Sequence, residues 1–101
     1  MFKSRLLWEP IRTFNAATLN GTFQAIGTPL ANPSYILKMV NTSDRDVTIS
    51  IDGTTAIDVC PGGSFWLYDE YDDIPANTQF YVNGSGGGTG TIYLVTQYRV
   101  R

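Results

Sequence analysis

The chain has 101 residues, of which 43% are apolar, 13% aromatic and 16% charged, and its formal net charge is −2. This length gives one domain, residues 1–101, with a single core, and the aromatic content excludes a disordered chain. The low charged fraction predicts that neighbouring molecules cover part of the surface. No apolar stretch approaches the roughly 20 residues that span a bilayer, and the three-residue apolar run Leu6–Trp8 is too short for a signal-peptide core. We therefore expect neither a membrane protein nor secretion by that route.

The first predicted strand runs from Leu6 to Phe14. Pro10 interrupts it and belongs on a sheet edge or at a bulge, because proline has no N–H to donate to a neighbouring strand. Residues 1–14 are accordingly expected to be either an edge strand or an arm that reaches across to a neighbour. A short strand follows at Gly21–Gly27. The next, Ser34–Val40, is largely apolar on both faces, which is typical of a central strand.

Residues 46–51 and 54–59 are predicted to pair antiparallel through a tight turn at Asp52-Gly53. Asp-Gly between alternating strands is a strong hairpin signal, because both residues tolerate the positive φ of a tight turn. An aromatic-rich strand is expected at Ser64–Tyr68, followed at 69–73 by an acidic turn at most.

The last two predicted strands are Gln79–Val82 and Thr91–Val100, joined by a glycine-rich, mobile hairpin loop at 83–90. About eight short antiparallel strands separated by turns predict an all-β fold, a single β-sandwich of jelly-roll type. Cys60 is the single cysteine. It excludes an internal disulfide and is expected to be a buried thiol, with an intermolecular bridge as the alternative.

Charge is strongly sorted along the chain. Residues 44–73 carry eight acids and one base, net −7, while the remainder carries one acid and six bases, net +5. Such segregation suits a molecule that meets a partner or a copy of itself through complementary faces. The alternative is that interleaving of the strands disperses these charges in the fold.

Few residues of this chain are suited to catalysis. Histidine, the commonest general base and zinc ligand, is absent, so we predict a non-enzymatic protein without a cofactor. Asp69–Asp73 offers carboxylates for acid–base chemistry or for Ca²⁺, but it does not match the helix-loop-helix calcium loop, and a solvated loop is the favoured interpretation. The glycine run at 85–90 lacks the Lys-Ser/Thr ending of a phosphate-binding loop.

Two binding functions remain as alternatives. Bases and aromatics near the termini have the composition of a nucleic-acid clasp, but a pI of about 4.7 argues against it. The residues concerned are Lys3, Arg5, Trp8, Arg12, Tyr98, Arg99 and Arg101. A carbohydrate-binding module would use an aromatic platform of Phe65, Trp66, Tyr68 and Tyr71 with the loop at 83–90, although strand aromatics more often belong to the core or to an interface.

Four segments carry a resemblance to the small β-sandwich virion proteins of tailed bacteriophages. They are Ser34–Asn41 (SYILKMVN), Val47–Gly53 (VTISIDG), Val59–Asp69 (VCPGGSFWLYD) and Gly90–Val95 (GTIYLV). The resemblance implies a structural virion component present in many copies, either a capsid decoration or cement protein or a part of the head-tail connector or collar. It also implies assembly in the host cytoplasm into a virion.

The leading hypothesis is therefore a structural protein that binds other virion proteins and copies of itself as a homo-oligomer. It would do so through complementary charged and apolar surfaces. The predicted acidic interface residues are Asp69, Glu70, Asp72 and Asp73. The predicted basic and terminal interface residues are Lys3, Arg5, Trp8, Arg12, Arg99 and Arg101.

Overall fold

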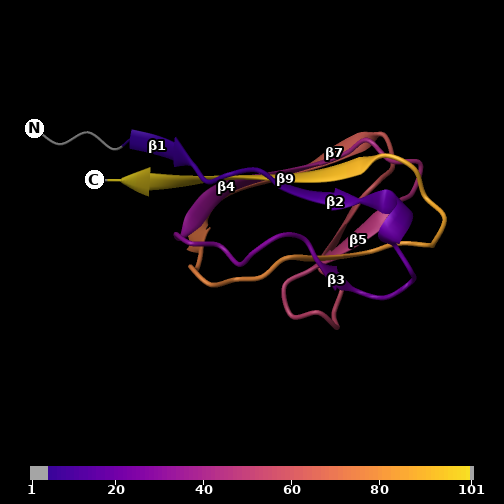
Figure 1. Cartoon of the computed structure of the whole chain (residues 1–101). Helices are drawn as coiled ribbons and strands as arrows, with labels where there is room; N and C mark the ends of the chain where they lie inside the picture. Colours follow the sequence, from indigo (N-terminus) through magenta and orange to yellow (C-terminus); the bar gives the residue numbers. More distant parts are fainter. Residues whose placement is uncertain (1–4, 101) are drawn as a thin grey trace, which may run out of the picture.

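A computed structural model describes residues 5–100, and at positions 5, 70–72 and 100 it describes the backbone alone. The larger of its two antiparallel sheets has the strand order β1-β9-β4-β7, with β2 pairing to β9 beside β1 (Figure 1). Its strands are β1 (Arg5–Trp8), β2 (Arg12–Asn15), β4 (Ser34–Asn41), β7 (Ser64–Ile74) and β9 (Thr91–Val100).

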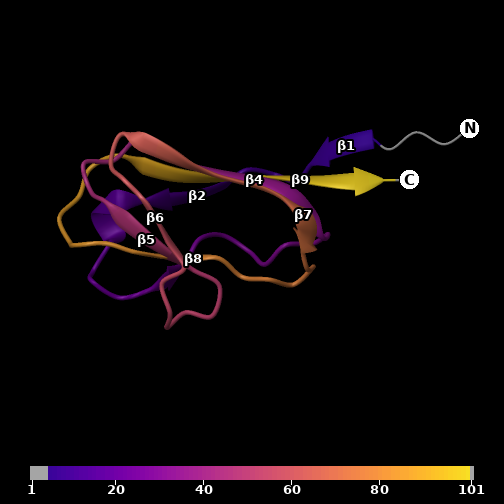
Figure 2. The ribbon, with the colours of Figure 1, turned by 180° about the vertical axis from the view of Figure 1, so that it is seen from behind.

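The smaller sheet has the order β3-β8-β5-β6, and Figure 2 labels its strands β5, β6 and β8. Its strands are β3 (Gln24–Ala25), β5 (Val47–Ser50), β6 (Asp58–Cys60) and β8 (Tyr81–Asn83). The helical structure among the described residues is one 3-10 turn, Ala16–Thr18, which is capped by the Asn15 side chain accepting a hydrogen bond from the Ala17 N–H.

Strand order identifies the sandwich as a jelly roll. Both β1 and β2 run antiparallel along β9, so they form one edge strand that Glu9–Ile11 interrupts. If β1 and β2 count as strand 1 and β3 to β9 count as strands 2 to 8, the two sheets have the orders 1-8-3-6 and 2-7-4-5. Every connection crosses between the sheets except the one that joins β5 to β6. The all-β, jelly-roll prediction is confirmed. Pro10 lies at an edge interruption, the kind of position that its missing N–H requires.

The core lies between the sheets and is built by strand alternation. In β4, Leu37 and Met39 are fully buried, while Lys38 and Val40 between and beyond them point to the other face. Thirteen buried apolar residues form this core: Ala16, Leu19, Ile26, Leu30, Leu37, Met39, Val47, Ile49, Cys60, Phe80, Val82, Ile92 and Leu94. The molecule measures 52 × 23 × 20 Å, because β1 and the end of β9 project beyond the small sheet (Figure 1).

A buried ion pair fixes the interruption between β1 and β2. Arg12 Nη2 lies 2.8 Å from Glu9 Oε1, and the two side chains are 7% and 3% exposed. The guanidinium also donates to the Thr28 and Pro29 carbonyls. Glu9 accepts from the Asn32 N–H at 2.8 Å and from the Asn32 side chain at 2.9 Å. The pair therefore holds the 28–32 loop against the sheet edge.

An antiparallel pair is found in this region as predicted, but its second strand is 58–60 instead of 54–59, and the tight turn is wrong. Ile49 pairs with Asp58, so the connection is a wider loop at 51–57. Asp52 organises this loop by accepting from the Thr54 and Thr55 N–H groups at 2.8 Å each. These hydrogen bonds hold the pKa of the Asp52 carboxyl far below its usual value.

The predicted acidic turn at 69–73 is wrong, since this segment continues β7. Asp69 pairs with Ile36 and Ile74 pairs with Ser34, with a register shift between the two pairs. Between these two pairs β7 has four residues and β4 has one. The three extra residues of β7 form a bulge, so the segment is an irregular strand at the edge of the sheet.

The glycine-rich loop at 83–90 is also not a hairpin, because it crosses from β8 in the small sheet to β9 in the large one. It is tied down by the Arg45 guanidinium, which donates to the Gly86 and Gly87 carbonyls. The Thr89 N–H donates to Asp44 at 2.9 Å. These contacts connect the loop to the 44–45 turn.

Cys60 is a buried free thiol, as predicted. Burial raises its pKa, and the charge of Asp58 adds to the shift.

We expect a soluble disulfide reagent to leave the Cys60 thiol of the folded protein unmodified and to react with one thiol per chain in denaturant. The thiolate is the reactive form, and burial in the fold disfavours it. Absorbance at the wavelength of the released thiol measures this. Rapid reaction of the folded protein would contradict the burial of Cys60.

Candidate interaction surface

One face of the large sheet covers the core, and the opposite face is lined with apolar side chains. We define this outer face by Trp8, Ile36, Lys38, Val40, Phe65, Leu67, Tyr93, Val95 and Gln97. Trp8 is 62% exposed, Phe65 61% and Leu67 51%, whereas Ile36, Val40, Tyr93 and Val95 are half-buried. Contiguous exposed apolar surface of this kind marks sites of interaction with other molecules.

Strand register gathers these side chains into rows. Val40 lies between Phe65 of β7 and Tyr93 of β9, and in the next row Lys38 lies beside Leu67. Neighbouring side chains on one face of an antiparallel sheet pack against one another. The outer face is therefore a continuous surface across β7, β4 and β9, which Trp8 of β1 extends, rather than a set of scattered residues.

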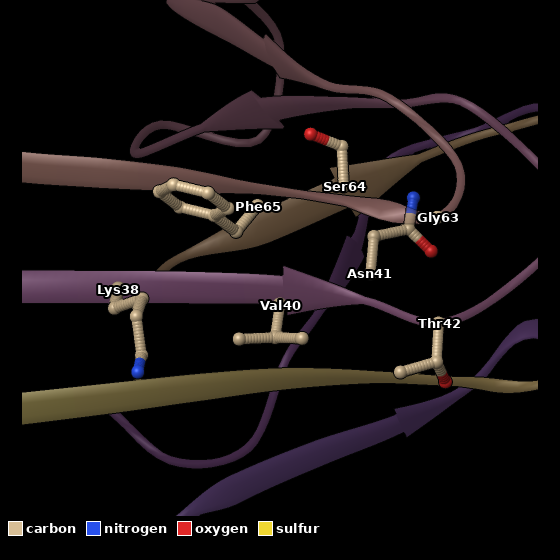
Figure 3. A pocket seen from close by; sticks show the side chains of 7 residues that line it. All are labelled: Lys38, Val40, Asn41, Thr42, Gly63, Ser64 and Phe65. Carbon is tan, nitrogen blue, oxygen red and sulfur yellow. The ribbon is translucent and has the colours of Figure 1, made fainter.

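Two hollows shape the outer face. The larger, of about 600 Å³, lies beside Val40 and Phe65 at the end where β4 gives way to a loop (Figure 3). Its lining consists of Lys38, Val40, Asn41, Thr42, Gly63, Ser64 and Phe65. The smaller, of about 350 Å³, lies toward the projecting end of the sheet. Its lining consists of Trp8, Ile36, Lys38, Leu67, Val95 and Gln97.

Asp69, which pairs with Ile36, places an acid at the β7 edge of the outer face, and Lys38 lines both hollows. It forms no salt bridge with any side chain that the structure describes. A lysine in such a place packs its carbon stem against apolar neighbours and keeps the ammonium in water. The outer face thus offers apolar area with a positive charge near its centre and an acid at its β7 edge.

The predicted basic and terminal interface residues lie in different parts of the structure. Trp8 lies on the outer face. Arg12 was wrongly assigned to an interface, because the ion pair with Glu9 buries it. The exposed Arg99 lies over the Tyr35 ring, 4.3 Å from its centroid. Arg5 occupies the first position of β1. Lys3 and Arg101 lie outside the described residues.

The predicted acidic interface residues all lie on β7, an edge of the large sheet. Asp69 and Asp73 are exposed, whereas positions 70 and 72 are described by backbone alone. The other acids of the 44–73 stretch belong to the small sheet and its loops. Folding therefore disperses part of the sequence segregation and leaves 69–73 as a compact acidic segment.

Strand alternation divides the predicted aromatic platform. Phe65 points to the outer face, whereas the half-buried Trp66 and Tyr68 pack against the core. Trp66 contacts the Phe80 ring at 6.4 Å between centroids and donates its indole N–H to Asp58 at 2.7 Å. Tyr71 is described by its backbone alone. The three described aromatics thus cannot serve as one stacking surface for a sugar.

Sequence reasoning did not single out Lys38, Val40 or Leu67. A signal was present, because Ser34–Val40 is apolar on both faces, and a sandwich strand covered on one side exposes its second apolar face. What could not be foreseen is that no other element of the described chain covers this face.

The described residues include no group of three or more His, Cys, Asp or Glu side chains placed to hold a metal ion. Within the same residues, no helix has the length and apolar character needed to cross a membrane. Comparison with known proteins finds no matching family model, no similar curated protein and no similar solved structure. The interpretation of the surface thus depends on its own geometry.

Proposed function

We propose that this protein is a non-enzymatic structural subunit of a tailed-phage virion, and that it packs against other virion subunits through the outer face of its large sheet. The observation that carries the proposal is the exposure of Trp8, Phe65 and Leu67 on one face of the large sheet. Such side chains favour burial against a partner, at roughly 25 cal/mol per Å² of apolar surface removed from water.

Fold and sequence support the virion assignment. Jelly rolls recur in viral capsid domains, although the same fold also serves lectins and other proteins. The strand and turn segments resemble those of small β-sandwich virion proteins. Because a fold by itself does not define a function, the proposal depends mainly on the exposed apolar side chains of the outer face.

Immunogold labelling tests the virion assignment. Antibodies raised against the purified protein are expected to label phage particles at a reproducible position on the capsid, connector or collar. Particles that remain unlabelled, while the antibodies still detect free protein in the same lysate, would contradict a virion component.

Substitution of Leu67 tests the role of the outer face. Tagged copies carrying Leu67→Lys are expected to enter particles at least about tenfold less than wild-type copies, because an unpaired charge in a buried interface costs several kcal/mol. The matched control is Val59→Lys on the small sheet, where Val59 is 47% exposed and Leu67 is 51% exposed. Quantitative blotting of purified particles measures incorporation. Equal incorporation of the two folded variants would exclude the outer face as the surface that docks onto the particle.

A further inference from the structure

Two cationic side chains lie on the outward side of the large sheet. Lys38 is an exposed residue of β4 that lines both hollows. Arg99 is an exposed residue of β9, and strand alternation from Val95 and Gln97 sets it on the same side of the sheet. Neither cation forms a salt bridge with a side chain that the structure describes. Both charges are therefore available to a molecule that packs on this side.

The Arg99 guanidinium is held in place by an aromatic ring. Its Cζ lies 4.3 Å from the centroid of the Tyr35 ring. Tyr35 is the extra residue where the pairing of β4 with β9 shifts register between Ser34 and Ile36, and a bulge of this kind re-aims a side chain. A guanidinium stacked on a ring keeps its N–H donors for a carboxylate, which it binds through two parallel hydrogen bonds.

The Lys38 side chain extends toward β9 and away from β7 (Figure 3). Asp69 of β7, which pairs with Ile36 in the next row, therefore does not neutralise the ammonium group. If a partner covers the outer face, it also removes water from this ammonium. Burial of an unpaired charge is strongly unfavourable, so the covering surface must supply an acid.

The two cations flank the smaller hollow. Lys38 lies beside Val95 in its row, and Arg99 lies four residues farther along β9, which corresponds to roughly 13 Å of strand. The hollow between them, of about 350 Å³, has Trp8 and Leu67 in its lining. A β-strand presents residues i, i+2 and i+4 on one face over the same distance. The spacing thus fits an acidic, an apolar and a second acidic residue on one face of a partner strand.

From these observations we infer that the outer face packs against another virion protein that presents two carboxylates, one to Lys38 and one to Arg99. An apolar side chain of that protein fills the smaller hollow between them. The inference rests on the proposed structural role and adds the chemistry of the partner. Paired charges at fixed positions also set the orientation in which the two surfaces meet.

A second copy of this chain does not offer such a surface among the described residues. Two outer faces stacked about a twofold axis would bring Lys38 of one copy near Lys38 of the other, because it lies near the centre of the face. Asp52 in the 51–57 loop already accepts from the Thr54 and Thr55 N–H groups, and the acids of 69–73 lie on a strand edge. The strand residues on the outward side of the small sheet are uncharged: Thr48, Ser50, Val59, Tyr81 and Asn83.

Zero-length crosslinking of purified particles tests the inference. A water-soluble carbodiimide activates a carboxylate, and a lysine amine in contact with it then forms an amide bond as the carbodiimide leaves as its urea. Mass spectrometry of the digested particles is expected to find Lys38 joined to an aspartate or glutamate of another virion protein. In Lys38→Arg particles this crosslink should disappear while incorporation stays like wild type, because arginine keeps the charge but has no amine to acylate.

Incorporation of uncharged variants separates charge pairing from apolar packing. Lys38→Met and Arg99→Met keep a long, unbranched side chain but remove the charge. Each is expected to enter particles at least about tenfold less than wild type, because it leaves a partner carboxylate buried without its counter-charge. Circular dichroism confirms folding, and Lys38→Gln or Arg99→Gln replaces a methionine variant that unfolds.

Three results would overturn the inference. They are particles that contain the protein but give no Lys38 crosslink, a Lys38 crosslink to a second copy of this chain, and folded methionine variants that enter particles like wild type. The first is also the result that a nucleic-acid partner would give.

Failure of the inference is separable from failure of the proposed function. If the protein is absent from particles, or if Leu67→Lys enters them like Val59→Lys, the proposed function itself fails. If Leu67→Lys is excluded while Lys38→Met and Arg99→Met enter normally, the outer face is retained as the docking surface and the two-carboxylate partner is rejected.

Discussion

Replacing Glu9 by glutamine is expected to lower the free energy of unfolding by about 3 kcal/mol at neutral pH. The substitution keeps the shape of the side chain but leaves the Arg12 guanidinium buried without its counter-charge. An uncompensated buried charge is far more costly than the loss of an exposed pair. The 28–32 loop would also lose a charged acceptor for the Asn32 N–H.

The same residue predicts a difference in acid sensitivity. Burial by itself raises the pKa of Glu9, but hydrogen bonds from Arg12, Asn32 and the Ala31 N–H outweigh it, and the pKa is lowered from 4.5. A carboxyl with a lowered pKa contributes stability above its unfolded pKa, and this contribution is lost as the pH falls through the folded value. Wild type should therefore lose more stability than Glu9→Gln on acidification below about pH 5.

Urea unfolding followed by tryptophan fluorescence measures both effects. The matched control is Asp44→Asn, which removes the charge from an exposed pair whose charged atoms lie 3.7 Å apart but keeps an oxygen acceptor for the Thr89 N–H. Its free energy of unfolding should stay close to wild type. If Glu9→Gln matched that control at neutral pH, the buried pair would not be the anchor of this sheet edge.

Replacing Gly90 by alanine is expected to lower the free energy of unfolding by about 3 kcal/mol. Gly90 has a φ of +107°, and a Cβ there would lie 2.8 Å from both the Thr42 carbonyl oxygen and the Ser43 Cα. Backbone atoms cannot rotate away as a side chain does. The loop from β8 would have to shift from its place before β9, where the Gly90 carbonyl accepts from the Ala16 N–H at 3.0 Å.

Gly21→Ala is the matched control for this substitution. Gly21 also has a positive φ, +82°, but a Cβ there meets nothing within 4 Å. Its alanine variant should cost about 1 kcal/mol, the conformational strain alone. Thermal unfolding by circular dichroism compares the two variants. Equal losses would mean that backbone conformation, and not close packing, explains the glycine at position 90.

Several elements could be predicted because their signal is local. Residues 34–40 and 91–100 alternate or remain apolar over enough residues to identify strands, and both strands lie where expected. Proline at position 10 indicated an edge for a chemical reason that holds in any fold. The buried thiol of Cys60 likewise follows from the general tendency of a free cysteine to lie in a core.

Other features depend on contacts between distant parts of the chain. Residues 69–73 have poor strand propensity, and pairing with β4 extends the strand through them. Arg12 is a charged residue of a predicted edge strand and is therefore expected at the surface, yet a loop sixteen residues later supplies carbonyl acceptors for it. The 83–90 loop could not be told from a hairpin loop, since its glycines fit either connection.

The sequence by itself determined that this protein is an all-β sandwich, because alternation of apolar residues and the chemistry of proline and glycine act within a few residues. Only the tertiary structure decided which apolar strand face stays uncovered and which charges reach the same sheet edge. Those outcomes depend on strand order and register, which are set by packing between segments far apart in the chain.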